Sequence, residues 1–289
     1  VIYRAILAQP DSKSSDYRRY SININMSNTN TKDIFERNIR QDEDSLFREW
    51  ASKRHPFATD GCANPTSFLQ SRQRIVFALK ERNWGHTISD QRNLQIGARE
   101  EIVEERDIFS DWWTLMAQWA DVLLPDKDAN ESWQQIQSRH IPSEKMTTEE
   151  RARWINEKNK RSLGKCACIQ LKKSPGGGEL NKEDFLTIVM EDRDLILRQL
   201  SFYSPHFVIS CGSNDSWLAF KDHIFKDQKV NQSTNGIHYF IVQMNNCNHK
   251  TAIVNFGHPS MRINSTLWGV LAFGLRETLE EIFCKLNKD

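Results

Sequence analysis

The sequence predicts an α/β protein: a three-layer α/β/α domain around a mostly parallel, four-stranded central sheet, with a helical and loose N-terminal extension. Three apolar runs, at residues 74–79, 166–171 and 207–211, lack the alternation of half-exposed strands and are typical of strands buried on both faces. Segments with helical spacing separate them, and this order favours parallel pairing. The 289 residues are 38% hydrophobic and 27% charged, as expected for a globular chain with a core.

The chain divides into two unequal parts. Residues 1–67 form an N-terminal part, in which residues 1–32 are rich in Ser, Asn and Asp and predict a loose arm. Apolar residues at helical spacing predict a helix over 33–52 that packs on the core. Residues 68–289 contain the α/β domain, and the polar stretch at about 126–162 predicts a helical insertion in it.

Four further segments predict helices. Residues 109–124 carry a wide apolar stripe, which is typical of a helix that faces a core. Thr147 and Glu150 form a capping box that begins a basic helix. We expect the last two helices at about residues 182–201 and 267–286.

The ends of the predicted strands are polar or rich in glycine. Residues 239–243 and 251–255 predict a hairpin across an Asn-rich turn, and its second strand is the last of the sheet. The four carboxyl ends read KERNWG, KKSPGGG, CGSND and GHPSMR. Ligands of open α/β sheets bind outside the carboxyl ends of the strands, so we expect the functional site there.

Composition excludes several classes of protein. No window of eighteen consecutive apolar residues exists, so we expect no membrane partner, and no secretory signal is visible. The six cysteines form no CxxC pair and no zinc spacing. We therefore expect free, buried thiols, a cytoplasmic location and no bound metal. The net charge of +1 neither requires nor excludes a nucleic-acid partner.

The motifs of common α/β enzymes are absent. The chain has no GxGxxG, GxSxG or HExxH, and it lacks the HxE and PCxxC pair of zinc base deaminases. Residues 176–178 are three glycines, but Glu179 follows them where a P-loop needs further residues ending in Lys and Ser or Thr. We expect no cofactor.

Two short motifs follow the first and last predicted strands. Residues 79–84 read LKERNW, and residues 258–262 read HPSMR. In these positions they resemble the two motifs of the uracil-DNA glycosylase superfamily, and the resemblance covers about residues 68–286. The LKE start and the LKKSPGG segment at 171–177 are similar to a bacterial branch that includes an anti-phage DNA glycosylase acting on glucosylated hydroxymethylcytosine.

The resemblance implies a catalytic site. Cleavage of a base–sugar bond passes through an oxocarbenium-like sugar, so it needs a carboxylate or amide near C1′ and a donor to the departing base. Glu81 matches the acidic position of the first motif, and Asn83 is its helper. His258 matches the histidine that donates a hydrogen bond to the base. An ion pair of Glu81 with a neighbouring Lys or Arg, a helix cap at Asn83 and a structural His258 are the alternative interpretations.

The remaining predicted contacts surround this site. Trp84 is placed to stack on an extruded base, and Gln170, where related proteins often carry Asn, to read a base edge. Lys172, Lys173 and Ser174 are predicted to hold a DNA phosphate, or else they form a plain strand-to-helix turn. The loop after His258 is predicted to press into the base stack. Its contributing residues are Ser260, Met261 and Arg262.

Basic residues also cluster after the capping box, and they offer an extension of the DNA surface. Glu149, Glu150 and Glu157 are interleaved with them, which favours an ordinary solvated helix. The basic residues are Arg151, Arg153, Lys158, Lys160, Arg161 and Lys165.

The predicted function is therefore a metal-independent DNA glycosylase. It flips a modified base of DNA, either a bulky glucosylated hydroxymethylcytosine of phage origin or uracil, and leaves an abasic site. No obligate protein partner is evident. Two alternatives stay open: a metal-dependent nuclease of the PD-(D/E)xK kind, for which Asp126 and Gln170-Leu171-Lys172 offer a degraded pattern, and a non-catalytic sensor of modified DNA.

Overall fold

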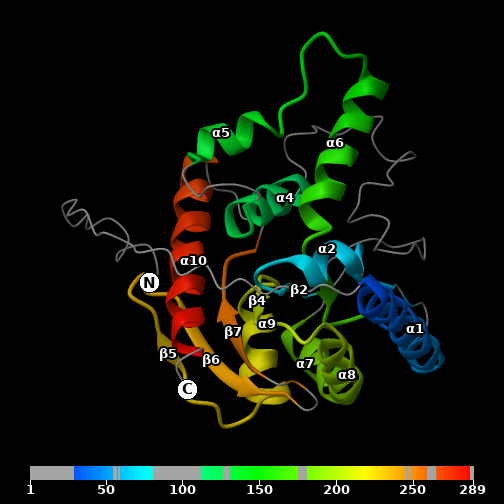
Figure 1. Ribbon diagram of the computed structural model, residues 1–289. Coiled ribbons are helices and arrows are strands. Elements are labelled where there is room, and N and C mark those ends of the chain that lie inside the picture. Colours follow the sequence, from blue (N-terminus) through cyan, green and yellow to red (C-terminus); the bar gives the residue numbers. More distant parts are fainter. Residues whose placement is uncertain are drawn as a thin grey trace.

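The architecture is a mixed sheet with helices on both faces (Figure 1). The computed structural model describes residues 29–54, 57, 59–80, 112–125, 131–174, 181–244, 247, 249–258 and 265–286.

Seven strands pair into one sheet in the described part of the chain, in the order β1-β3-β2-β4-β7-β6-β5. The neighbours β3, β2, β4 and β7 run parallel, while β1, β6 and β5 pair antiparallel at the two ends of the sheet. The predicted α/β class is confirmed, but the expected sheet of four strands was incomplete, because this sheet is larger and mixed. The strands are β1 Gly61–Cys62, β2 Ile75–Leu79, β3 Ala167–Gln170, β4 Phe207–Ser210, β5 Asn231–Gln232, β6 His238–Gln243 and β7 Lys250–Asn255.

The predicted hairpin is confirmed as β6 and β7, which pair in register from Tyr239 opposite Val254 to Gln243 opposite Lys250. The two strands that the sequence missed, β1 and β5, have two residues each. A segment of that length carries no periodicity, so sequence pattern does not reveal it.

The helices largely follow the predicted segments. The capping box at Thr147 and Glu150 is present. The segment predicted as one helix at 182–201 is divided at Asp192, which ends one helix and begins the next. The helices are α1 Thr29–Lys53, α2 Pro65–Gln70, α4 Trp112–Leu123, α5 Trp133–Ser138, α6 Thr148–Leu163, α7 Lys182–Glu191, α8 Arg193–Tyr203, α9 Asn214–Leu218, the π-helix η3 Ala219–Ile224 and α10 Ser265–Leu286.

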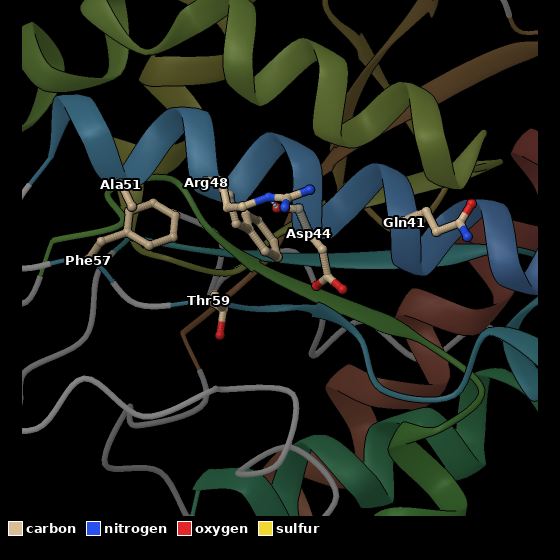
Figure 2. A pocket seen from close by; sticks show the side chains of 7 residues that line it. Gln41, Asp44, Arg48, Ala51, Phe57 and Thr59 are labelled. Atoms are coloured by element: carbon tan, nitrogen blue, oxygen red, sulfur yellow. Dashed lines mark hydrogen bonds between the residues drawn. The ribbon is translucent and has the colours of Figure 1, made fainter.

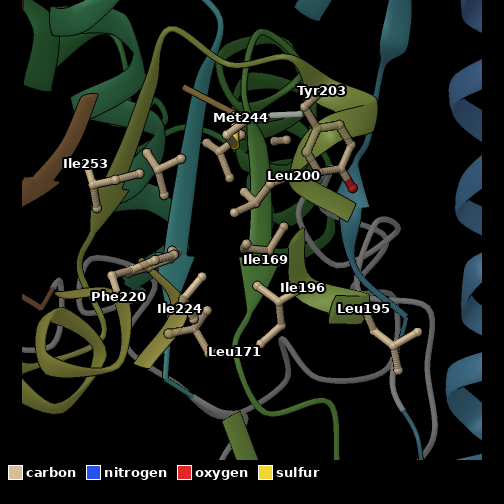
Figure 3. Close-up of a cluster of buried hydrophobic side chains, with 14 of the residues drawn as sticks. Ile169, Leu171, Leu195, Ile196, Leu200, Tyr203, Phe220, Ile224, Met244 and Ile253 are labelled. Atoms are coloured by element: carbon tan, nitrogen blue, oxygen red, sulfur yellow. The ribbon is translucent and has the colours of Figure 1, made fainter. Parts of the chain in front are cut away.

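Alternate residues of the central strands face two separate hydrophobic cores. Val76 and Ala78 of β2 face the first core, together with side chains from α1, α7, α8, α9 and η3. Figure 3 shows part of this core, with labelled side chains from β3, α8 and η3. Ile75 and Phe77 face the second, which α4, α5, α6 and α10 cover. Both faces of β2 are buried, and this explains its continuous apolar sequence.

The N-terminal helix α1 is part of the first core. It packs against α8, beside which it lies in Figure 1, and Leu46 and Trp50 are fully buried. All six cysteines are free, and five of them are buried. Among the described residues no helix is long and apolar enough to cross a membrane, and no group of three or more metal-ligating side chains occurs.

Candidate functional site

The carboxyl end of β2 is a topological switch point of the sheet. The next described element after β2 is α4, which covers the second core, whereas β3 and β4 lead to α7 and α9 on the opposite face. Connections that leave neighbouring strands toward opposite faces open a crevice between the strand ends, and ligands of such sheets bind there. The site predicted from the strand ends therefore falls where the topology favours it.

Lys80, directly after β2, is held from both sides. Its carbonyl accepts a hydrogen bond from the Lys172 backbone N–H at 3.0 Å, which extends the pairing of β2 with β3 beyond the strands. Its ammonium lies 3.0 Å from an Asp215 carboxylate oxygen and 5.1 Å from the centre of the Phe185 ring. The chain thus reaches the residue before Glu81 in a fixed position, although Glu81 itself lies outside the described residues.

The loop after β4 approaches Lys80 closely. A Cβ atom on Gly212 would lie 2.2 Å from the Lys80 backbone nitrogen, so only glycine fits there. The next residue, Ser213, has φ 90°, a conformation that L side chains rarely adopt, and its hydroxyl caps α9 by accepting a hydrogen bond from the Asp215 N–H. Backbone strain of this kind is frequent at functional sites. From the sequence, CGSND is predictable only as a polar strand end, and the glycine after the buried apolar run is the signal for this close approach.

The end of β7 carries His258. The Phe256 N–H donates to the Ser210 carbonyl at 2.9 Å, so the chain stays paired with β4 beyond the strand. The Phe256 ring packs edge-on against Trp119, with ring centres 5.2 Å apart. His258 follows two residues later and is half-buried, and burial lowers its pKa below the ordinary value. A neutral imidazole, which can donate one hydrogen bond, is therefore the favoured form near neutral pH.

Gln170 and Lys172 lie at the same edge of the sheet, next to β2. Gln170 is the last residue of β3, opposite Leu79, and its side chain is buried. Its backbone N–H donates to an Asp60 carboxylate oxygen at 2.6 Å. The Lys172 ammonium donates to the Ser174 carbonyl at 3.1 Å, so it curls back on the turn where we predicted a phosphate contact.

Lys173 does not lie on the surface that was predicted to hold a DNA phosphate. Its ammonium is buried, 2.6 and 2.7 Å from the two Asp60 carboxylate oxygens and 2.7 Å from the Gln199 amide oxygen. The Trp50 ring centre is 4.8 Å away. Burial lowers the Lys173 pKa, and the Asp60 charge opposes that shift. We assign Lys173 a structural role, since its donors already have partners in the core.

Six predicted site residues lie outside the part of the chain that the structure describes, so their placement relative to His258 and Gln170 stays a prediction. These are Glu81, Asn83, Trp84, Ser260, Met261 and Arg262. Of the described candidates, Gln170, Lys172, Ser174 and His258 all follow or end strands of the parallel group, at its carboxyl edge.

A pocket of about 560 Å³ lies elsewhere, against α1 (Figure 2). Two phenylalanine rings, 5.9 Å apart, form part of its wall, and polar side chains surround them. None of the predicted site residues lines it, so it does not bear on the site at the strand ends. The lining residues are Gln41, Asp44, Phe47, Arg48, Ala51, Phe57 and Thr59.

No protein-family model matches the chain, and no curated protein is significantly similar to it in sequence.

Proposed function

We propose that the protein is a DNA glycosylase that extrudes a modified base and hydrolyses its N-glycosidic bond. The observation that carries the proposal is the position of His258: a half-buried imidazole with a lowered pKa at the same sheet edge from which the chain enters the LKERNW segment. An imidazole that donates a hydrogen bond at this edge suits bond cleavage in which a base departs with negative charge.

The proposed reaction divides the work between the two motifs. Glu81 orients a water molecule and stabilises the positive charge that develops on the sugar, with Asn83 as its helper. The water oxygen forms a bond to C1′ and its proton passes to the Glu81 carboxylate, while the bond from C1′ to the base nitrogen breaks and its electron pair leaves with the base. His258, neutral at pH 7, donates a hydrogen bond to that departing base.

Other residues at the edge of the sheet suit substrate binding. Gln170 ends β3 beside the switch point, and we assign to its buried amide the reading of the edge of an extruded base. Trp84 is the proposed stacking partner, and Ser174, Ser260, Met261 and Arg262 are the proposed DNA contacts. Lys172 is a proposed DNA contact only as a support for Ser174, because its ammonium donates to the Ser174 carbonyl.

The fold supports the same proposal only at the level of its α/β class. The parallel group β3, β2, β4 and β7, covered by helices on both faces, is compatible with the α/β/α core that the resemblance to the uracil-DNA glycosylase superfamily implies, although the whole sheet is larger and mixed. The proposed substrate is DNA that carries glucosylated hydroxymethylcytosine of phage origin, or else uracil.

An alkali-cleavage assay in the presence of EDTA tests the proposal. Duplexes with uracil, hydroxymethylcytosine or its glucosylated form are incubated with the protein and then treated with alkali. We expect strand breaks at one modified base, and only after alkali, because a glycosylase leaves an intact backbone. Breaks that need Mg²⁺ and no alkali would indicate a nuclease instead. Tight binding of modified DNA without base release would indicate a sensor.

A further inference from the structure

The chain leaves the neighbouring strands β4 and β7 toward opposite faces of the sheet. After β4 it continues into α9, which packs in the first core, whereas the next described element after β7 is α10, which covers the second core. Parallel strands with this arrangement have a crevice for a ligand at their carboxyl ends. The half-buried His258 follows the end of β7 by three residues. The residues that end β4 and β7 are therefore candidates for ligand contacts.

Asn255 and Ser210 end these two strands side by side. They are partners in the parallel register of β7 and β4, and the residues two positions earlier, Ile253 and Val208, both lie in the first core. Because side chains alternate along a strand, Asn255 and Ser210 project toward the same face of the sheet as those two residues. A polar pair thus takes the place of an apolar pair at the edge of the crevice.

The Asn255 amide has hydrogen-bonding groups that the described part of the protein does not use. The side chain is half-buried, and it makes no hydrogen bond within the residues that the structure describes. An Asn amide carries two donor hydrogens and an acceptor oxygen. Such a group beside a crevice is suited to a planar ligand whose edge offers both a donor and an acceptor.

Two buried hydroxyl groups lie close to the end of β4. Ser210 and Ser216 are fully buried, and neither Oγ has a hydrogen-bond partner in the described part of the chain. A Cβ atom on Gly212 would overlap the Ser216 Oγ, so the glycine leaves the space that this hydroxyl occupies. Buried polar groups without a partner are rare, and a functional role is one explanation for them. Together with the positive φ of Ser213, they favour a functional region at this strand end.

We propose that Asn255 is a specificity-determining residue that reads the hydrogen-bonding edge of the extruded pyrimidine. The inference rests on the proposed function for the choice of substrate. It deepens that function, because it assigns base recognition to the end of β7 as well as to Gln170 at the end of β3. The Asn255 amide donates to a carbonyl oxygen or ring nitrogen of the base and accepts from its amino group or its N3–H.

Replacing the amide by a carboxylate tests the inference, because a carboxylate only accepts hydrogen bonds. The kcat/KM for base release is measured for the wild type, Asn255→Asp and Asn255→Ala. The duplexes carry uracil, hydroxymethylcytosine or its glucosylated form opposite guanine. A carboxylate accepts the amino hydrogens of a cytosine-type base but repels the O4 of uracil.

The two variants should therefore differ in a way that depends on the base. We expect Asn255→Asp to stay within about threefold of the wild type on cytosine-type bases and to lose roughly tenfold or more on uracil. Asn255→Ala should lose roughly tenfold on every base that the wild type releases. A purely structural role would lower the activity of a variant equally on all bases.

Asn231→Asp is the matched control. Asn231 is another half-buried asparagine of the same sheet, but it pairs with Tyr239, a residue of the second core, so it lies on the opposite face. Because solvent and salt screen a charge that does not touch the base, Asn231→Asp should change kcat/KM on each duplex by less than about twofold. Melting temperatures of the three variants check that each is folded.

The outcomes separate the inference from the proposed function. If the wild type releases a base and Asn255→Ala is as active as the wild type, or Asn255→Asp and Asn255→Ala lose equally on cytosine-type bases, the inference fails and the proposed function stands. If no duplex loses a base, the proposed function fails, and the affinities of the same variants for the same duplexes are compared by fluorescence anisotropy. The base-dependent pattern expected for the rates would then support the inference, and equal affinities of the wild type and Asn255→Ala would overturn it.

Discussion

The Lys173 ammonium and the Asp60 carboxylate form a buried ion pair between residues 113 positions apart, with both oxygens within 2.7 Å of the nitrogen. The pair connects the turn after β3, where Lys173 lies, with Asp60, the residue directly before β1. The Gln199 amide bridges it to α8, since its Nε2 donates to Asp60 at 2.8 Å and to the Tyr203 hydroxyl at 3.1 Å. This cluster fixes the exit of β3 beside the candidate site.

We predict that Lys173→Met destabilises the protein by about 3–5 kcal/mol, because it keeps most of the apolar stem but leaves a buried Asp60 charge without its partner. The measurement is the free energy of unfolding in urea. The double variant Lys173→Met/Asp60→Asn should recover part of that loss, because the amide oxygen still accepts a hydrogen bond and carries no charge.

The exposed Lys182 at the start of α7 provides the control, and Lys182→Met should change stability by less than about 0.5 kcal/mol. A loss below about 1 kcal/mol for Lys173→Met would contradict a structural role for the ion pair.

The free energy of unfolding should decrease as the pH is lowered, because of His206. Burial, together with the charges of Arg74 and His249, lowers the pKa of His206 to about 3. The unfolded chain takes up this proton near pH 6.5, whereas the folded protein resists it until about pH 3. The free energy of unfolding therefore decreases as the pH falls through that window, at up to about 1.4 kcal/mol per pH unit from this group.

Urea unfolding between about pH 7 and about pH 5 measures this dependence. His206→Asn should reduce the slope, since Asn does not titrate and its oxygen can replace the imidazole Nδ1 that accepts the Arg74 N–H at 2.9 Å. The exposed His238 is the matched control, and His238→Asn should keep the wild-type slope. An unchanged slope in His206→Asn would refute the assignment.

Substitution by alanine should change the stability of the protein in opposite directions at two glycines. The Cβ of Gly212→Ala would meet backbone atoms of Lys80 and Leu79 at 2.2 and 2.7 Å, and backbone cannot move aside as a side chain can. We expect a loss of about 1–3 kcal/mol. Gly274, within α10, has no atom within 4 Å of the added carbon, so Gly274→Ala should raise stability by up to about 1 kcal/mol. Thermal melting of both variants checks the pair, and a stable Gly212→Ala protein would disprove the close approach of β2 and the β4 loop.

The lowered pKa of His258 predicts the pH profile of base release. A neutral donor needs no added proton, so the single-turnover rate constant should not decrease as the pH rises through about 6.5. A decrease in that range, absent from His258→Gln, would mean that a protonated imidazole takes part and would contradict the proposed role.

Local sequence signals predicted the elements that local interactions determine. The apolar run of β2 and the capping box at Thr147 lie where expected. The division of one predicted helix at Asp192 was missed, because its carboxylate pairs with Arg54 at 3.0 Å, 138 positions away in the sequence.

The candidate site was predictable only as far as its location at the strand ends. Lys172 and Lys173 have the same chemistry, are neighbours in sequence and are both buried, yet Lys173 pairs with Asp60 whereas the Lys172 ammonium donates to the Ser174 carbonyl. Likewise, the requirement for glycine at position 212 arises from the approach of Lys80, which belongs to another strand. Such roles depend on contacts between segments that are distant in the sequence, and neither periodicity nor motif spacing predicts those contacts.

The most direct test of the central claim is mass spectrometry of the free bases released from modified duplexes in EDTA. The account predicts one free modified base from the wild type, and at least a hundredfold slower release by Glu81→Gln and by His258→Ala, since each loses a group that stabilises the transition state. The exposed or partly exposed His223 and His238 provide the controls, and their alanine variants should keep the wild-type rate. No free base from any duplex, or full activity in Glu81→Gln and His258→Ala, would contradict the account.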